Sequence, residues 1–157
     1  MEEKSTLKMA GFNILLVEDN EADIKITQRA FGKVVFDNQL FVVKDGEAAV
    51  EYLEQKGAFE NLKDYKKIDL ILLDINMPKL NGFDVLLKIK ANRELIHIPV
   101  IVLTSSQNEL DILKSYQLGA ASFIQKPIDF NQFLEIVNMF NNYWHVCVKL
   151  PKKIEID

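Results

Sequence analysis

The segment LILLDINMP places a single carboxylate, Asp74, directly after four apolar residues. Three other apolar runs also lead into groups that can bind ions: Glu18 and Asp19 follow the first run, Thr104 follows the fourth, and Lys126 follows the fifth after one further residue. Three carboxylates held close together repel one another and raise their own pKa values unless a cation joins them. Hard oxygen ligands of this kind suit Mg²⁺, and Mn²⁺ could take its place.

The same residues also match the needs of phosphoryl transfer. A lysine ammonium is a compact positive charge for a phosphoryl oxygen, and a threonine hydroxyl is a neutral donor. An aspartate carboxylate can accept a phosphoryl group and become an acyl phosphate. The chemistry that uses all five residues is therefore magnesium-assisted phosphorylation of Asp74.

The elements that must position these residues are five short apolar runs alternating with segments of helical periodicity. Several of the runs are continuously apolar, a pattern typical of strands buried on both faces of a parallel sheet. We expect strands at 13–17, 40–43, 69–73, 99–103 and 122–124, and helices at 21–31, 47–55, 82–91, 108–117 and 129–141. This alternation predicts an α/β fold with a mostly parallel sheet. Ligands of such sheets bind beyond the carboxyl ends of the strands, where the candidate residues are expected.

Each candidate also has a simpler interpretation when it is taken alone. Asp74 could be an ordinary turn aspartate, and Glu18 with Asp19 could be an acidic pair stabilised by the dipole of a helix N-terminus. Thr104 could be an ordinary strand-end hydroxyl and Lys126 a solvated surface lysine. Their coincidence at the ends of four strands favours the joint site.

Composition limits the classes of function. Hydrophobic residues make up 48% of the 157 residues, which indicates a globular domain, and the length fits one domain. A net charge of −4 argues against direct binding to nucleic acid. No apolar run approaches the roughly 20 residues that span a membrane, and the N-terminus lacks the apolar core of a signal peptide. With Cys147 as the single cysteine, we expect a cytoplasmic protein.

Four segments resemble a known family, the receiver domains of two-component response regulators. They are LLVEDN, DLILLDINMPKLNGFDVL, IPVIVLTSS and GAASFIQKPID, and the resemblance covers residues 12–141. It implies a flavodoxin-like (βα)5 fold, a doubly wound parallel sheet with strand order 2-1-3-4-5. Residues 1–11 and 142–157 would then be N-terminal and C-terminal extensions.

The resemblance also implies a role for each site residue. Asp74 would be the phosphoacceptor, and Glu18 and Asp19 would hold Mg²⁺ (or Mn²⁺) together with Asp74 and the backbone carbonyl of Asn76.

The remaining site residues would respond to the phosphoryl group. Thr104 would follow this group as it binds, and Lys126 would pair with it. Phe123 takes the position of the family's rotating aromatic switch residue, although a plain core aromatic would also fit there. Lys126 and Pro127 resemble the family's cis peptide, a conformation that is uncommon even before proline.

The expected function is that of a single-domain response regulator. It would accept a phosphoryl group from a sensor histidine kinase in a two-component phosphorelay and signal by phosphorylation-dependent protein interaction. It would not be an enzyme, although it would assist its own phosphorylation and dephosphorylation with magnesium. The last expected helix leaves only 142–157, too few residues for a DNA-binding output domain.

Two segments resemble a narrower group, the single-domain regulators paired with phytochrome-type histidine kinases. These are the long polar connection at 56–67 and the residues after the last helix. In that tail apolar side chains alternate with more polar or smaller neighbours, at Trp144, Val146, Val148 and Leu150, which is typical of a half-buried extended strip. The strip could fold back on its own domain, or it could form a homodimer with the fourth helix, fifth strand and fifth helix.

Three other functions fit less well. A calcium-binding loop beginning at Asp74 fails because Pro78 and Lys79 replace a ligand and a glycine, and Val85 replaces the final glutamate. A nucleotide-binding enzyme lacks the expected glycine-rich motifs. A receiver-like module that is never phosphorylated conflicts with the presence of a competent residue at every motif position.

Overall fold

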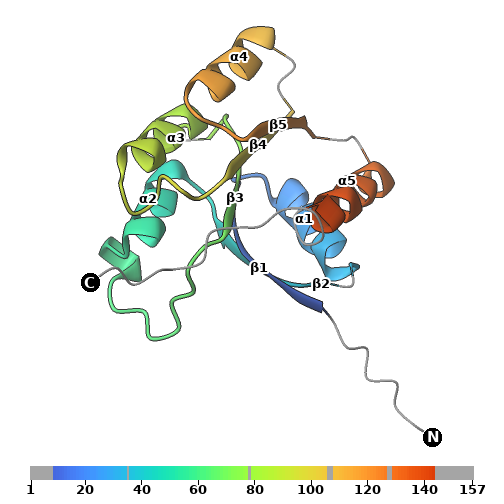
Figure 1. Cartoon of the computed structure of the whole chain (residues 1–157), viewed down its shortest axis with the longest axis horizontal. Coiled ribbons are helices and arrows are strands. Elements are labelled where there is room, and N and C mark those ends of the chain that lie inside the picture. The colour runs from blue at the N-terminus through green and yellow to red at the C-terminus, as the bar shows by residue number, and fades with distance from the viewer. Residues whose placement is uncertain (1–8, 35, 78, 106–107, 127–128, 144–157) are drawn as a thin grey trace, which may run out of the picture.

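A five-stranded sheet with helices on both faces forms the molecule (Figure 1). The computed structural model describes residues 9–34, 36–77, 79–105, 108–126 and 129–143. The strands are β1 Met9–Val17, β2 Phe36–Val43, β3 Leu70–Leu73, β4 Val100–Thr104 and β5 Ser122–Gln125. The helices are α1 Glu21–Gly32, α2 Gly46–Glu54, α3 Gly82–Ala91, α4 Glu109–Gln117 and α5 Phe130–Asn142. A short 3-10 helix, η1, covers Gly57–Phe59.

All the strand pairs are parallel, and the strands lie in the order β2-β1-β3-β4-β5. The predicted fold class and strand order are therefore confirmed. Helices α1 and α5 lie on one side of the sheet, and α2, α3 and α4 lie on the other (Figure 1). The order reverses direction at β1, so that β1 and β3 are neighbours and their carboxyl ends lie side by side. This is the place where open α/β sheets bind ligands.

The central strands are mostly apolar because both faces of the sheet are covered. Successive side chains point to opposite faces, so Leu15, Leu73 and Val102 pack with α2 and α3, whereas Leu16 and Leu72 pack with α1 and α5. Each of these five side chains is 5% exposed or less. Burying one such side chain contributes about 2 kcal/mol, and the two cores therefore hold the strand ends in fixed positions.

Asparagine and aspartate caps determine where four of the helices begin. The side chains of Asn20, Asp45 and Asn81 each accept a hydrogen bond from a backbone N–H three residues later, and Asn108 accepts one from Leu110. Such caps satisfy backbone N–H groups that have no partner inside the helix. The predicted boundaries of all five helices agree with the structure to within one residue at each end.

Strands β1 and β2 each begin four residues earlier than predicted, at Met9 and Phe36. The added part of β2 alternates between buried and exposed positions, so it lacks the continuous apolar run of a central strand. The register between β1 and β2 shifts between Ala10 and Asn13. Gly11 lies at this irregularity, where a Cβ would come within 2.3 Å of the carbonyl oxygen of Asp37. The extension therefore depends on pairing between the two strands, which the apolar pattern did not reveal.

The polar connection at 56–67 lies on the surface, as predicted, but two aromatic residues anchor it. The rings of Phe59 and Tyr65 each have their centroids 5.2 Å from that of Tyr52 on α2. Phe41 of β2 stacks on Tyr52 at 6.1 Å. Tyr52 is buried, and aromatic pairs at these distances add stabilisation beyond their buried area. This aromatic group fastens the connection to the α2 side of the sheet.

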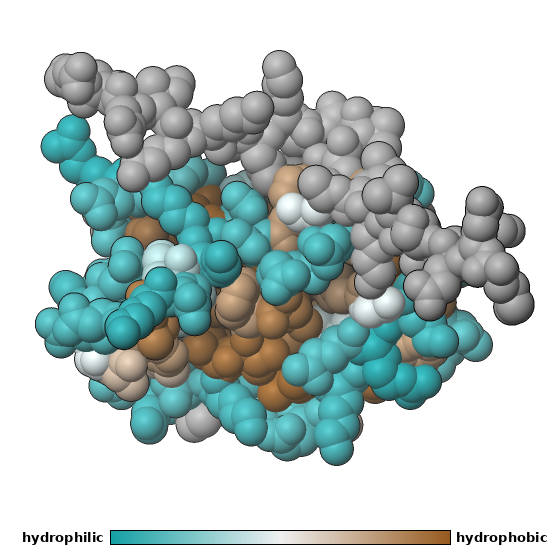
Figure 2. Space-filling model, turned by 90° about the horizontal axis from the view of Figure 1, so that it is seen from below, coloured by the Kyte–Doolittle hydropathy of each residue, from teal (hydrophilic) through white to brown (hydrophobic). Residues whose placement is uncertain are grey.

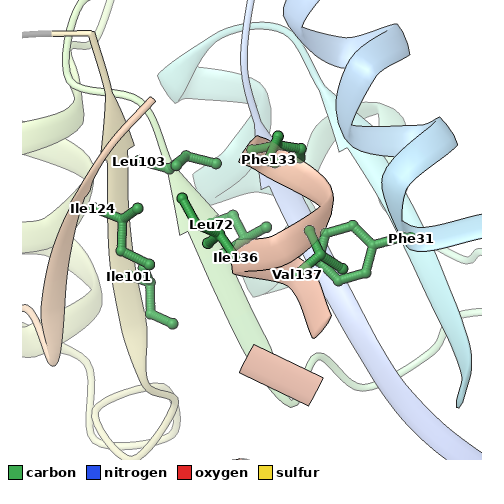
Figure 3. A pocket seen from close by; sticks show the side chains of 8 residues that line it. All are labelled: Phe31, Leu72, Ile101, Leu103, Ile124, Phe133, Ile136 and Val137. Carbon is green, nitrogen blue, oxygen red and sulfur yellow. The ribbon is translucent and has the colours of Figure 1, made fainter. Parts of the chain in front are cut away.

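A small recess lies between α5 and the sheet on the opposite side (Figure 3). Its volume is about 20 Å³, and its lining is apolar: Phe31, Leu72, Ile101, Leu103, Ile124, Phe133, Ile136 and Val137. A space of this size holds about one water molecule, and apolar walls give a water no partner. The recess is therefore a packing gap.

Seen from below the view of Figure 1, the surface has a central apolar area enclosed by hydrophilic residues (Figure 2).

Among the residues that the structure describes, none of the helices has both the length and the apolar character needed to cross a membrane.

Candidate functional site

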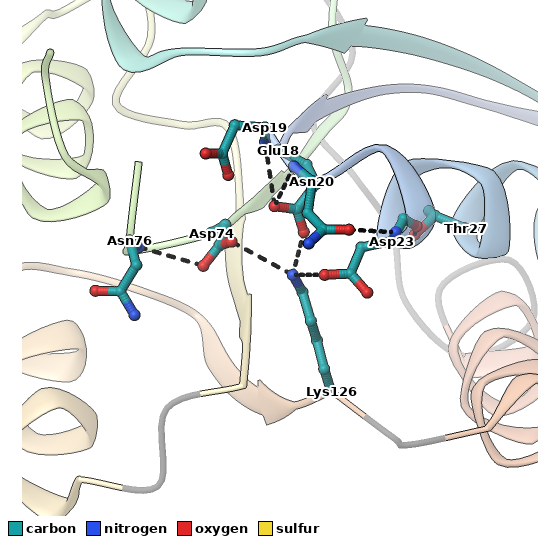
Figure 4. Close-up of polar contacts among 8 residues, drawn as sticks. All are labelled: Glu18, Asp19, Asn20, Asp23, Thr27, Asp74, Asn76 and Lys126. Atoms are coloured by element: carbon teal, nitrogen blue, oxygen red, sulfur yellow. Dashed lines mark hydrogen bonds and ion pairs between the residues drawn. The ribbon is translucent and has the colours of Figure 1, made fainter. Parts of the chain in front are cut away.

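The three predicted carboxylates meet at the carboxyl ends of β1 and β3. The register places Val17 beside Leu73, and the backbone N–H of Asp74 donates to the carbonyl of Val17 at 3.0 Å. Ligand oxygens of Glu18, Asp19 and Asp74 all lie within 4.8 Å of one another. Glu18 and Asp74 are buried, whereas Asp19 is exposed. The structure therefore brings together the acidic cluster that the sequence predicted (Figure 4).

Lys126 reaches the same cluster from the end of β5, two strands away from β3. Its Nζ donates to Oδ2 of Asp74 at 3.3 Å, to Oδ2 of Asp23 at 2.9 Å, and to Oε1 of Glu18 (Figure 4). The backbone N–H of Lys126 donates to the carbonyl of Thr104 at 2.9 Å. The end of β4 thereby fixes where the lysine side chain begins.

The remaining predicted residues lie on β4, on β5 and just after β3. Thr104 ends β4, between β3 and β5, and is fully buried. The backbone N–H of Asn76 donates to Oδ1 of Asp74 at 3.3 Å. Phe123 lies on β5 and packs partly buried against the core, and its backbone N–H donates to the hydroxyl of Tyr116 on α4 at 3.2 Å. The predicted cis peptide involves Pro127, which lies outside the described residues.

The start of α3 supports the segment that carries Asp74. Gly82, the first residue of α3, donates its backbone N–H to the carbonyl of Ile75 at 2.8 Å. A Cβ at Gly82 would come within 2.3 Å of the carbonyl oxygen of Asp74, closer than real Cβ contacts allow. Glycine at this position therefore lets α3 begin directly against the acidic segment.

Burial dominates the electrostatics of Glu18. Removal from water is the largest of the effects that together raise the pKa of Glu18 from 4.5 to about 8; the neighbouring Asp74 adds to this rise, and Lys126 opposes it. Burial lowers the pKa of Lys126, but the hydrogen bonds that its ammonium donates to Asp23 and Glu18, together with the charge of Asp74, outweigh this effect and raise its pKa above the ordinary 10.5. The lysine is therefore charged at neutral pH, whereas Glu18 retains a proton that a cation could replace.

An open recess of about 360 Å³ adjoins the acidic cluster on the side of α3 and α4. Its lining is mixed: Asp19, Ile75, Asn76, Met77, Asn81, Phe83 and Asp111. A space of this size admits a small phosphorylated molecule or a protruding side chain. A reactant can therefore approach Asp74 from this recess.

Sequence reasoning missed Asp23 as a site residue. Its position three residues after Asn20 indicated only its part in the helix cap, and its backbone N–H does donate to Asn20. The signal that could have found it is its place in the first turn of α1, only four residues after Asp19 and so close to the acidic pair along the chain.

A parallel sheet that presents an aspartate, an acidic pair and a lysine at one edge defines a phosphoacceptor domain of signalling proteins. The chain belongs to the response regulator receiver domain family, whose family model matches residues 14–138. The matched residues lie inside the predicted 12–141. The resemblance found in the sequence motifs is therefore confirmed.

Several known proteins are similar over most of the chain. Response regulator Rcp1 of Synechocystis sp. is 39% identical over 138 residues, which are 88% of this chain and 92% of that protein. The structure of the phosphorylated cyanobacterial phytochrome response regulator RcpA is 39% identical with a TM-score of 0.83, covering 90% of this chain and 99% of that chain. The Mn²⁺-bound form of Rcp1 is 38% identical with a TM-score of 0.81 and the same coverage. The narrower resemblance to phytochrome-associated regulators is confirmed by these similarities.

Proposed function

We propose that this response regulator receives a phosphoryl group on Asp74 from a sensor histidine kinase. A carboxylate oxygen of Asp74 attacks the phosphorus atom of a phosphohistidine, a P–O bond forms, and the P–N bond breaks with its electron pair returning to the imidazole. The observation that carries the proposal is the contact between Lys126 Nζ and Asp74 Oδ2, beside two further carboxylates. Little covalent chemistry is required of the protein, which contributes positioning and charge neutralisation.

The residues present fit a divalent cation. Glu18, Asp19 and Asp74 would hold Mg²⁺ or Mn²⁺ together with the backbone carbonyl of Asn76. Support comes from the oxygens within 4.8 Å of one another and from the raised pKa of Glu18, because a cluster that retains a proton favours added positive charge. The structure of Mn²⁺-bound Rcp1 supports this assignment by similarity. The cation would neutralise the charge that develops on the phosphoryl oxygens.

Lys126 would pair with a phosphoryl oxygen, and Thr104 would donate its hydroxyl to another. Movement of Thr104 toward the group would leave room for Phe123, which packs on the neighbouring strand. This change would bias the surface of α4 and β5 between two arrangements, and its size is limited by the contacts that differ between them.

Intact mass after incubation with acetyl phosphate and Mg²⁺ tests the acceptor. The wild-type protein should gain the mass of one phosphoryl group, and Asp74→Asn should gain none. Asp84→Asn is the control, because Asp84 lies exposed in the first turn of α3 outside the acidic cluster. Equal phosphorylation of Asp74→Asn and the wild-type protein would show that another residue is the acceptor.

The comparisons support a proposal for the donor, and the donor's chemistry supports one for the cellular setting. RcpA is described as a phytochrome response regulator, and we extend this pairing with a phytochrome-type kinase to the present chain. The protein would assist transfer to and hydrolysis from its own Asp74 without acting as an enzyme on other substrates. A cytoplasmic location completes the proposal, because the kinase that supplies the phosphoryl group uses ATP.

Signalling would proceed through a homodimer formed by α4, β5, α5 and residues 142–157. Apolar side chains that are exposed on α4, at Leu110 and Leu113, support an interface there. Sedimentation of the full chain and of a chain truncated after Asn142, each with and without a phosphoryl mimic, tests the dimer. A monomer in all four samples would contradict it.

A further inference from the structure

Asp23 contacts Lys126 of the site, although Asp23 was not among the predicted site residues. It lies in the first turn of α1, and its side chain points away from the cap and toward Lys126 (Figure 4). The distance from Asp23 Oδ2 to Lys126 Nζ is 2.9 Å, shorter than the 3.3 Å from Asp74 Oδ2 to the same nitrogen. Asp23 therefore holds the lysine at least as closely as the proposed phosphoacceptor does.

The ammonium of Lys126 has as many carboxylate partners as it has N–H donors. A lysine ammonium carries three N–H groups. Within the described part of the chain, Nζ donates to one oxygen each of Glu18, Asp23 and Asp74. A phosphoryl oxygen on Asp74 would be an additional acceptor. One of these three groups must then give up the hydrogen bond that it accepts from the lysine.

The exposed fractions of the side chains indicate which carboxylate this is. The side chain of Glu18 is 2% exposed and that of Asp74 is 10% exposed, whereas that of Asp23 is 36% exposed. A buried carboxyl oxygen that loses its hydrogen-bond donor is left without a partner, but water can replace the donor to an exposed oxygen. Glu18 also accepts hydrogen bonds from the backbone N–H groups of Asp19 and Asn20, which hold it in place.

We propose that Asp23 is a positioning residue that holds Lys126 before phosphorylation and releases it to the phosphoryl group. The inference rests on the proposed phosphorylation of Asp74. In the unmodified protein, Asp23 keeps the ammonium beside the acceptor carboxylate but competes for it. In the phosphorylated protein, the lysine pairs with a phosphoryl oxygen, and water molecules replace the lysine as hydrogen-bond partners of the Asp23 carboxylate.

This exchange predicts unequal effects on two rates. During transfer from acetyl phosphate, a bond forms between Asp74 and phosphorus while the bond from phosphorus to acetate breaks, and the lysine must leave Asp23. During hydrolysis, a water oxygen bonds to phosphorus and the bond from Asp74 breaks, but the lysine has already left Asp23. Removal of Asp23 should therefore accelerate phosphorylation and leave the hydrolysis rate unchanged.

Rates of phosphorylation and hydrolysis in the full-length protein test the proposal. Asp23→Ala should be phosphorylated by acetyl phosphate and Mg²⁺ roughly threefold to fivefold faster than the wild-type protein, the range for a partly exposed ion pair. Glu21→Ala is the matched control, because Glu21 lies in the same turn of α1 and pairs with Lys44 instead of Lys126. Asp23→Glu should return the rate toward the wild-type value.

A spectroscopic measurement separates the contact from a general effect on structure. In the metal-free protein, the NMR signal of the Lys126 ammonium should shift in Asp23→Ala and stay in place in Glu21→Ala. A beryllium fluoride phosphoryl mimic with Mg²⁺ should move the wild-type signal toward that of the variant.

Three results would overturn the inference while phosphorylation of Asp74 stands: equal acceleration in the Glu21→Ala control, a wild-type rate in Asp23→Ala, or equal changes of both rates in that variant. If the wild-type protein takes up no phosphoryl group, the proposed function fails and the release step fails with it.

Discussion

The buried carboxyl of Glu18 should make the stability of the metal-free protein depend on pH. Its pKa is about 8 in the folded protein and near the ordinary 4.5 in the unfolded chain. Below pH 4.5 both states hold the proton, and the stabilising contribution is fully present. Between these pKa values the folded state holds one proton more than the unfolded state, so the free energy of unfolding falls as the pH rises. The contribution is lost once the pH passes the folded pKa.

The size of the effect follows from the same two pKa values. The free energy of unfolding changes by at most about 1.4 kcal/mol per pH unit in this interval. Over the whole interval between the two pKa values, the loss of stability is therefore at most roughly 5 kcal/mol. Glu18→Gln is the reference, because glutamine resembles the protonated carboxyl and does not titrate. Urea denaturation of both proteins in a chelator, at several pH values between 4.5 and 8, should show the wild-type protein losing stability relative to the variant. Parallel curves across this interval would refute the reasoning.

Mg²⁺ should reverse the trend, because a cation and a proton compete for the Glu18 carboxylate. Added Mg²⁺ should stabilise the wild-type protein more near pH 8 than near pH 4.5. Its binding near neutral pH should release protons, which calorimetry in buffers of different ionisation enthalpy can detect. Proton release of the same size in Glu18→Gln would assign the titration to another group.

Three further changes test other parts of the structure. Asp19→Ala removes an exposed carboxylate of the cluster and should weaken Mg²⁺ binding and slow phosphorylation; an unchanged magnesium titration would argue against this ligand. Gly82→Ala should reduce the free energy of unfolding by about 1 to 3 kcal/mol and slow phosphorylation, because a Cβ there would collide with the backbone of Asp74. Gly32→Ala, whose Cβ would meet nothing within 4 Å, should change neither quantity appreciably in the same urea and kinetic assays. Tyr52→Ala should cost about 3 kcal/mol in urea denaturation, since it removes the ring on which the connection at 56–67 packs; a loss below about 1 kcal/mol would show that these contacts contribute little.

The sequence predicted the sheet well where local and global signals coincide. Residues 70–73 of β3 and 100–103 of β4 are continuously apolar because helices cover both faces of the sheet, a pattern typical of buried parallel strands. Caps such as Asn81 mark the start of a helix in the sequence itself, since the asparagine must precede the first turn. The placement of Asp74, Glu18 and Lys126 could be predicted because parallel strands end at one edge.

The missed features depend on contacts between distant segments. The early part of β2 is stabilised by pairing with β1, and its own residues carry no continuous apolar signal. Asp23 looks like an ordinary first-turn acid until the end of β5 brings Lys126 beside it, 103 residues later. The local sequence likewise does not indicate that Phe59 and Tyr65 pack against Tyr52. These contacts form only in the tertiary structure.

The described end of α5 is tied to β2, 103 residues earlier in the chain, by a pair of asparagines. Asn38 Nδ2 on β2 donates to Asn141 Oδ1 at 2.7 Å, and Asn141 Nδ2 donates to the carbonyl of Val137 at 3.0 Å. Asn38 Oδ1 in turn accepts from the backbone N–H of Phe12 at 3.0 Å. Asn141 is 1% exposed, so opening this connection would leave buried amide groups without partners.

Terminal helices usually fray, and their amide hydrogens exchange with solvent through small local openings. The last turn of α5 cannot open in this way without also separating Asn38 from Asn141 at the start of the sheet. Its amides should therefore exchange together with those at the beginning of β1 and β2, as one cooperative unit. The first and last elements of this domain would then unfold as neighbours, although more than a hundred residues separate them along the chain.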